Sequence, residues 1–230
     1  MKRFILSLLL VFSVGAQAQQ PVSDLMLDDL MSPDEIAEEA NLPATRYQEN
    51  ILSVEQAYQA NGNYDVTRDY PIVVRINKSA YGPNAQRLWL YEYGQLTSTY
   101  LVSTGRERWE EAKSGRRYFS VTPTGWFHPK RFVRNHWSST WQTYMEFSIF
   151  FNGGIALHAT TPPYYPLLGQ RASGGCVRQT RETAEYLYNR GLAVRTAFVP
   201  MVHPTGEVAR DSNGNIIRIF ASNMLIIVEN

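Results

Sequence analysis

The single cysteine of this 230-residue chain, Cys176, lies in a stretch that strongly limits how the chain can fold. His158 precedes it by eighteen positions, residues 173–175 (Ser-Gly-Gly) come immediately before it, and Arg178 follows two positions later. A thiol nucleophile needs a base to accept its proton and a tightly turning backbone that presents amide donors. It often also needs a cation that holds a substrate carboxylate. All three occur within twenty-one residues, so we expect one site built from both ends of this stretch.

The surroundings of Cys176 favour a reactive thiol over a structural one. A lone cysteine is most simply a small buried hydrophobic residue. The Ser-Gly-Gly before it and the arginine after it do not resemble a core strand. Exported proteins usually pair their cysteines, and this one has no partner within the chain.

Residues 1–18 have the pattern of a secretory signal. Lys2 and Arg3 precede an apolar run over 4–14, and Ala16-Gln17-Ala18 fits a cleavage site. The alternative is a membrane anchor, but the apolar run is short for a span. We therefore expect a periplasmic or secreted protein with no stable membrane span after cleavage.

Charge is distributed unevenly along the chain. The net charge is +1, with 44% hydrophobic residues, as in a globular protein. The first 55 residues carry nine acids and three bases, whereas the remainder carries nineteen bases and twelve acids. A basic body suits an anionic polymer such as the cell wall, although an ordinary solvated surface explains the charge equally well.

The segment before residue 67 is predicted to be helical. Ser32, Pro33 and Glu35 form a capping box with proline in the first turn. A second helix is expected over 46–60, ended by Asn-Gly. We expect this segment to pack on the body or to act as a spacer, and we identify no chemistry in it. The alternative to a plain N-terminal extension is a partner-docking arm.

From residue 71 the pattern becomes β. Strands are expected over 72–76 and 155–157, with a hairpin over 87–102 and an exposed loop over 106–118. After Cys176, Thr180 is predicted to cap a helix that ends at Gly191. Strands over 192–199 and 224–228 and a hairpin turn at 212–215 complete the chain.

Several windows of this chain resemble the L,D-transpeptidase catalytic domain family (YkuD-like). The family pattern is a His, a gap, then Ser/Thr-His-Gly-Cys, a small apolar residue and Arg or Asn. Matching positions are His158, Ser173, Gly175, Cys176, Val177 and Arg178, together with Val102-Ser-Thr-Gly105 and Thr122-Pro-Thr-Gly125. One position departs from the pattern: Gly174 stands where the family usually has His. This departure bears on rate, thiol pKa and acceptor choice more than on reaction class.

The resemblance implies a mostly β fold, a β-rich α+β protein. We expect an L,D-transpeptidase-like β-sandwich with a helix after the cysteine motif and a small N-terminal helical extension. The expected divisions are a signal peptide over 1–18, an acidic helical extension over 19–66, the catalytic domain over 67–200, and a C-terminal hairpin and strand over 201–230 that complete it.

The resemblance also assigns roles at the site. Cys176 is the expected nucleophile and His158 its base, oriented by the backbone carbonyl of Ala159. The backbone amide of Gly175 is expected in the oxyanion hole. The residues expected to bind substrate are Arg178 through a carboxylate, Ser173, Tyr165 and Trp141. For Arg178 the alternative is a structural salt bridge with an acid such as Glu182, and for Ser173 a role in fixing the loop is favoured over proton transfer.

The resemblance implies transpeptidation of peptidoglycan tetrapeptide stems by a protein associated with the cell wall. Cys176 attacks the stem, D-alanine leaves, and an amine resolves the thioacyl enzyme. That amine comes from a second stem, a lipoprotein lysine or a D-amino acid. The alternatives are an L,D-carboxypeptidase or hydrolytic amidase with the same site, a sortase-like enzyme, and a non-catalytic wall-binding module. The short gap between His158 and Cys176 argues against the sortase-like enzyme.

No cofactor, metal or nucleic acid is expected. His128, His136 and His203 have no metal-like spacing, and no phosphate-binding glycine loop or nucleic-acid motif occurs.

Overall fold

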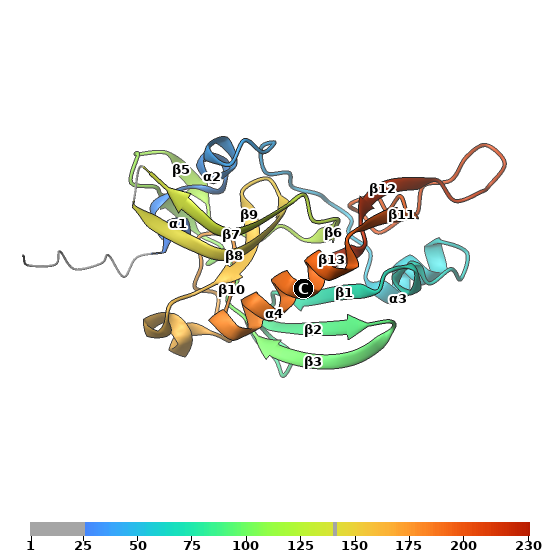
Figure 1. Cartoon of the computed structure of the whole chain (residues 1–230), viewed down its shortest axis with the longest axis horizontal. Coiled ribbons are helices and arrows are strands. Elements are labelled where there is room, and N and C mark those ends of the chain that lie inside the picture. The colour runs from blue at the N-terminus through green and yellow to red at the C-terminus, as the bar shows by residue number, and fades with distance from the viewer. Residues whose placement is uncertain (1–25, 140–141) are drawn as a thin grey trace, which may run out of the picture.

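Two facing β-sheets form the centre of the protein in the computed structural model, which describes residues 26–139 and 142–230 (Figure 1). The five-stranded sheet has the order β3-β2-β1-β13-β6, with β1 Ile72–Asn77, β2 Arg87–Glu92, β3 Gln95–Leu101, β6 Gly125–Phe127 and β13 Met224–Glu229. The four-stranded sheet has the order β10-β9-β8-β7, with β7 Arg131–Ser138, β8 Thr143–Asn152, β9 Ile155–Ala159 and β10 Val177–Gln179. The expected mostly β sandwich is confirmed.

The main core lies between these sheets. Alternate residues of β1 and β2, such as Val74 and Leu90, pack against Ile149 and Leu157 of β8 and β9. The helix α4, Arg181–Val194, packs on β8 and β9, and its buried Leu187 belongs to the same core. The helix expected after the cysteine motif is therefore present.

The five-stranded sheet is covered on both faces, which explains the apolar run near the C-terminus. Residues Met224 to Val228 of β13 are all fully buried, and β13 pairs in parallel with β1. Its second face packs under a layer formed by α3 (Val54–Ala60), η1 (Val66–Asp69), β11 (Thr196–Pro200) and β12 (Arg218–Ser222).

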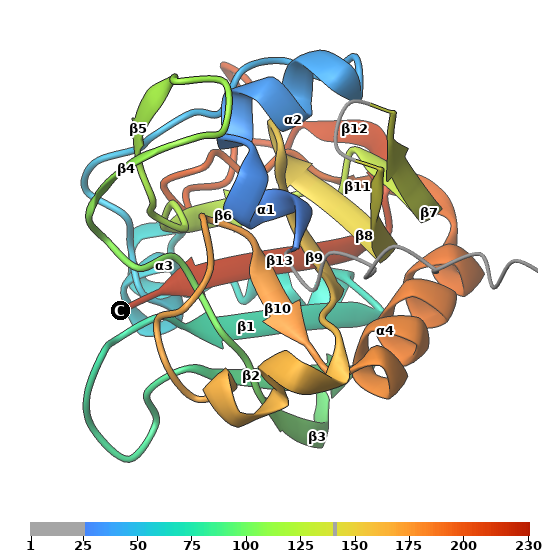
Figure 2. The same ribbon diagram turned by 90° about the vertical axis from the view of Figure 1, so that its left-hand side faces the viewer.

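A third layer covers the other face of the four-stranded sheet. It is built by α1, Leu27–Leu30, and α2, Pro33–Glu39, with the expected Ser32 capping box present. Their apolar side chains pack with Met145 and Phe150 of β8. Figure 2 shows α1 and α2 over this region, beside the hairpin of β4 (Trp109–Glu111) and β5 (Arg117–Phe119).

Four of the expected elements were wrong in their bounds or in their type. The second N-terminal helix spans only Val54–Ala60, because a capping box between Ser53 and Gln56 starts it there. Residues 106–118 contain the β4–β5 hairpin instead of a plain loop. The helix α4 continues past Gly191. Glycine is required there by packing and not as a helix stop, because an added Cβ would lie 2.6 Å from the Phe132 ring. Because α4 ends at Val194, the following strand starts at Thr196 and not at 192.

The expected signal sequence, residues 1–18, lies outside the described residues. Across 26–139 and 142–230, no helix has the length and apolar character needed to cross a bilayer.

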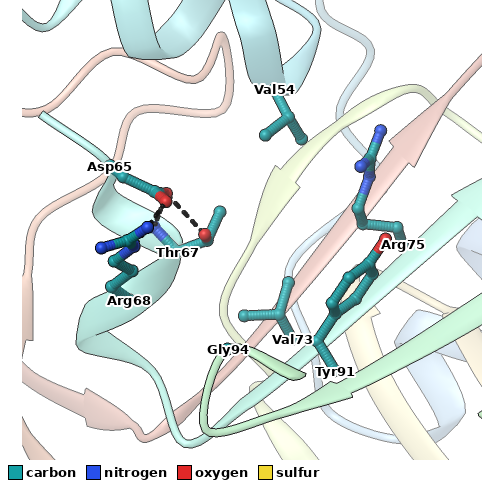
Figure 3. A pocket seen from close by; sticks show the side chains of 8 residues that line it. All are labelled: Val54, Asp65, Thr67, Arg68, Val73, Arg75, Tyr91 and Gly94. Atoms are coloured by element: carbon teal, nitrogen blue, oxygen red, sulfur yellow. Dashed lines mark hydrogen bonds and ion pairs between the residues drawn. The ribbon is translucent and has the colours of Figure 1, made fainter. Parts of the chain in front are cut away.

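A pocket of about 190 Å³ lies where α3 and η1 meet the outer face of β1 and β2 (Figure 3). Val54 and Val73 supply its apolar wall. Its charged groups are already paired, Asp65 with Arg68 at 3.1 Å and Arg75 with Glu229 at 2.7 Å. It shares no residue with the cysteine site described below.

His128, which follows β6, makes folding stability depend on pH. Its Nε2 lies 2.8 Å from the Tyr70 hydroxyl, which also donates to the Pro200 carbonyl, and burial lowers the His128 pKa to about 4. The unfolded chain takes up this proton near pH 6.5, so the stabilisation is complete above that pH and is lost as pH falls toward 4. We expect His128 to remove ~3 kcal/mol from the free energy of unfolding over this range.

Urea unfolding between pH 7 and 4.5 measures this effect. The His128→Gln variant should show a shallower loss of stability than the wild type, and His203→Gln, at an exposed position, is the matched control. Equal slopes in the wild type and His128→Gln would contradict the assignment.

Candidate active site

Strand pairing brings the two ends of the His158–Arg178 stretch together. The strands β9 and β10 are parallel neighbours, and His158 is directly opposite Arg178 in their register. Cys176 immediately precedes β10. The connection between the strands, residues 160–176, contains η2, Pro162–Leu167, and is long enough for the chain to return and pair in parallel. The parallel register therefore places imidazole, thiol and guanidinium in one region.

His158 is oriented to act as a base through Nε2. Its Nδ1 lies 2.8 Å from the carbonyl oxygen of Ala159, so Nδ1 carries the proton and donates it. In the neutral ring Nε2 is then an acceptor, and it has no hydrogen-bond partner among the described residues. A ring nitrogen of His158 lies within 4.8 Å of the Cys176 sulfur.

The Cys176 thiol is held as a neutral group. Its sulfur accepts from the Ala156 amide at 3.4 Å, and the thiol donates toward the Gly154 carbonyl at 3.6 Å. The residue is 1% exposed. Burial raises the pKa of the thiol far above its usual range, and the nearby Asp28 carboxylate raises it further.

The backbone before the cysteine is fixed by two hydroxyl groups. Ser173 Oγ donates to the Cys176 carbonyl at 2.6 Å and accepts from the Gly175 amide at 3.1 Å. Thr122 Oγ1 donates to the Gly175 carbonyl at 2.6 Å and accepts from the Gly105 amide at 2.9 Å. Gly175 has φ +143°, which favours glycine. Each of these two buried hydroxyl groups donates one hydrogen bond and accepts another, and together they fix the conformation of the loop before Cys176.

Arg178 forms a buried ion pair with two acids of α1. Its Nη2 lies 2.8 Å from Asp28 Oδ1 and 2.8 Å from Asp29 Oδ2, and its Nε lies 3.2 Å from both Asp28 oxygens. The Tyr164 ring lies over the guanidinium, with its centre 5.2 Å from Cζ. The partner of Arg178 is therefore the N-terminal segment and not Glu182.

Asp28 also reaches the other groups of the site. Its Oδ1 lies 3.9 Å from His158 Nε2, and its Oδ2 lies 3.3 Å from the Gly174 amide. Although burial alone raises its pKa, the charges of Arg178 and His158 outweigh this effect, and the pKa of Asp28 is lowered. Burial lowers the pKa of His158 in turn, so its ring is neutral at pH 7.

Asp28, His158 and Cys176 offer ligand atoms within 4.8 Å of one another. A dication there would lie against the Arg178 guanidinium, which already occupies Asp28 Oδ1 at 2.8 Å. The geometry is that of an ion pair beside a thiol and an imidazole.

Three further residues from the sequence analysis are Tyr165, Trp141 and His136. The Tyr165 hydroxyl accepts from the Arg181 amide at 3.0 Å, at the start of α4. Trp141 lies outside the described residues. His136, on β7, is buried and its ring stacks edgewise on Phe150, with centres 5.4 Å apart.

Sequence reasoning missed Asp28, Asp29 and Thr122 as parts of this site. Arg106 was also missed: it donates to Asp29 at 2.9 Å and is held by Glu110 at 2.6 Å. One signal was present in the sequence, since two adjacent acids sit inside the apolar pattern Leu-Met-Leu-Asp-Asp-Leu-Met of residues 25–31. Glycine at 174, where a histidine was expected, was a second signal.

A thiol beside an oriented imidazole is the arrangement used for nucleophilic catalysis by cysteine. The family described as YkuD, L,D-transpeptidase catalytic domain, matches residues 71–203, which is more than half of the chain. The chain belongs to this family. No curated protein matches it.

Solved structures of several L,D-transpeptidases are similar. One from Xylanimonas cellulosilytica is 23% identical, with 86% of this chain and 77% of that chain covered and a TM-score of 0.47. One from Stackebrandtia nassauensis is 17% identical, covering 76% and 64%, with a TM-score of 0.43. One from Mycobacterium tuberculosis is 16% identical, covering 70% and 58%, with a TM-score of 0.44. The chain thus spans less than two thirds of the latter two, and its family membership rests on the domain match.

Thr122 gives a test of how the loop is held. Replacing it with valine keeps the shape but leaves the Gly105 amide and the Gly175 carbonyl without their buried partner. We expect Thr122→Val to lose about 2 kcal/mol of unfolding free energy. Thr122→Ser keeps the hydroxyl and is the control. Urea unfolding of both variants measures the difference, and equal losses would show that the hydroxyl is not responsible.

Proposed function

We propose that this protein is an exported cysteine L,D-transpeptidase that acts on peptidoglycan tetrapeptide stems. The observation that carries the proposal is the oriented His158. Its Nδ1 is held by the Ala159 carbonyl, Nε2 has no hydrogen-bond partner among the described residues, and a ring nitrogen lies within 4.8 Å of the Cys176 sulfur. Membership of the L,D-transpeptidase family supports the choice of substrate.

Each step of the reaction has a group to perform it. The thiol of Cys176 loses its proton to His158 Nε2 and attacks the carbonyl carbon of the third stem residue. The bond to the terminal D-alanine breaks, and the imidazolium returns the proton to the leaving amine. A thioester on Cys176 remains. The amine acceptor then attacks this thioester, His158 takes the amine proton, and the thiolate leaves.

Arg178 is the group that would hold a carboxylate of the donor. A guanidinium binds a carboxylate through two parallel hydrogen bonds, and Arg178 makes such contacts with Asp28, from Nε to Oδ2 at 3.2 Å and from Nη2 to Oδ1 at 2.8 Å. The amides of Gly175 and Cys176 are proposed for the oxyanion. In the described structure Gly175 donates to Ser173, so this amide must be redirected when substrate binds.

Water in place of the amine would make the same site an L,D-carboxypeptidase or an amidase. A second stem, a lipoprotein lysine and a D-amino acid are the candidate acceptors. The periplasm or the cell surface is the proposed location, on the pattern of residues 1–18.

Mass spectrometry of the full chain with disaccharide-tetrapeptide fragments tests the function. The donor is supplied at millimolar concentration, and Cys176→Ala serves as the inactive control. We expect free D-alanine, an acyl-enzyme mass and cross-linked dimers with the wild type alone. Tripeptide without dimers would indicate hydrolysis. If neither the wild type nor the Asp28→Asn variant forms a product, the non-catalytic wall-binding module is the remaining alternative.

A further inference from the structure

The α1 segment occupies the groups that a donor peptide needs, and this observation extends the function proposed above. Asp28 presents a carboxylate to Arg178 with contacts of 2.8 and 3.2 Å, as a substrate carboxylate would. The same carboxylate accepts a hydrogen bond from the Gly174 amide at 3.3 Å. Arg178 is 1% exposed in this state, so no second carboxylate can reach it.

Asp28 is placed as a competitor and not as the third member of a catalytic triad. An orienting acid binds the histidine nitrogen that does not face the nucleophile. Here that nitrogen, Nδ1, is already held by the Ala159 carbonyl. Asp28 instead faces Nε2, at 3.9 Å, which is the nitrogen that must receive the thiol proton.

Apolar side chains of the same segment close over the thiol. Leu27, Leu30 and Ile36 are each at most 4% exposed and belong to one cluster with Cys176. The hairpin of β4 and β5 holds this cover in place, since the Lys113 amide donates to the Leu30 carbonyl at 2.9 Å. The thiol therefore has no route to a peptide while the segment is in place.

Two glycines of the catalytic domain fit this segment. A Cβ on Gly174 would lie 1.7 Å from the Asp28 carbonyl oxygen, and one on Gly154 would lie 1.9 Å from the Pro33 carbonyl oxygen. Neither glycine has a positive φ, so the backbone conformation does not demand glycine at either place. Close approach of residues 28 and 33 is the feature that excludes a side chain there.

We propose that residues 26–40, the covering segment, are a built-in competitive inhibitor of the active site. Asp28 takes the place of the donor carboxylate on Arg178, and α1 and α2 cover Cys176. The donor stem must displace the covering segment before acylation. The wild-type chain is consequently latent, and its apparent affinity for the donor is reduced by the fraction of closed molecules.

The rate of Cys176 labelling by Ellman's reagent at pH 7.5 tests latency without any peptidoglycan substrate. Three full-chain variants weaken the closed state in different ways. Asp28→Asn removes the charge, Leu30→Asp places a charge in the apolar cover, and Gly174→Ala introduces a Cβ where Asp28 lies. We expect each to label Cys176 about tenfold faster than the wild type or more. Glu39→Gln, at an exposed position of α2, is the matched control and should label at the wild-type rate.

The outcomes separate the alternatives. If Asp28 instead supported catalysis, Asp28→Asn would label more slowly, which would overturn the proposal. Wild-type labelling rates in all three variants would also overturn it. Asn is isosteric with Asp, so loss of a cooperative thermal transition in Asp28→Asn would mean that the covering segment is an integral part of the folded body. That result would count against displacement as well.

Turnover of the tetrapeptide donor distinguishes this inference from the proposed function. We expect Asp28→Asn to lower the apparent KM about tenfold and to leave kcat at saturating donor within about twofold. Faster labelling of the variants without turnover would support the inhibitory role of the covering segment and contradict the proposed transpeptidase activity. Turnover by the wild type, together with an unchanged apparent KM in Asp28→Asn, would support the transpeptidase activity and contradict the inhibitory role of the covering segment.

Discussion

The buried ion pair between Arg178 and Asp28 is the interaction on which the arrangement of the site depends. Both side chains are almost fully enclosed, at 1% and 2% exposure. Removing one partner of such a pair typically costs about 3–5 kcal/mol, because the other charge stays buried and unpaired. The covering segment can therefore leave only if another anion replaces Asp28 or if Arg178 becomes hydrated. A donor peptide with a free carboxylate would meet the first condition, so in the proposed function one contact would link closure of the site to recognition of its substrate.

Asp28 also bears on the unusual residue of the cysteine motif, through its backbone carbonyl. A histidine at position 174 would have its Cβ within 1.7 Å of the Asp28 carbonyl oxygen, so the family residue and the covering segment exclude each other. The proposed base is unaffected, because His158 is oriented from its own strand by Ala159. The departure from the family pattern thus bears on access to the thiol and leaves the proton acceptor in place. The covering segment buries the thiol, and this burial raises the pKa of Cys176.

Local patterns predicted the strands and capped helices well, because each depends on neighbouring residues. The Ser32 capping box, the hairpin over 87–102 and the strand leading to His158 were predicted from residues close in sequence. The sequence predicted one site built from both ends of the stretch from 158 to 178, but it did not predict the parallel pairing of β9 with β10 that places Arg178 opposite His158. The role of Asp28 was not predictable in this way, since its partner is 150 positions distant and an acid in a short helix usually faces water. Gly191 was misread for a similar reason: its role is contact with Phe132 across the core, which no local pattern reveals.

Hydrogen–deuterium exchange of the Cys176→Ala chain, with and without saturating disaccharide-tetrapeptide, tests the central claim most directly. The substitution prevents turnover, so the bound state can be observed at equilibrium. The backbone amides of α1 and α2 are held by bonds such as Met31 to Leu27 at 3.0 Å and Ala40 to Ile36 at 2.9 Å. The account predicts that donor binding accelerates exchange across residues 26–40 while protecting the loop at 173–176. Unchanged or slower exchange over 26–40 with the donor bound would contradict it.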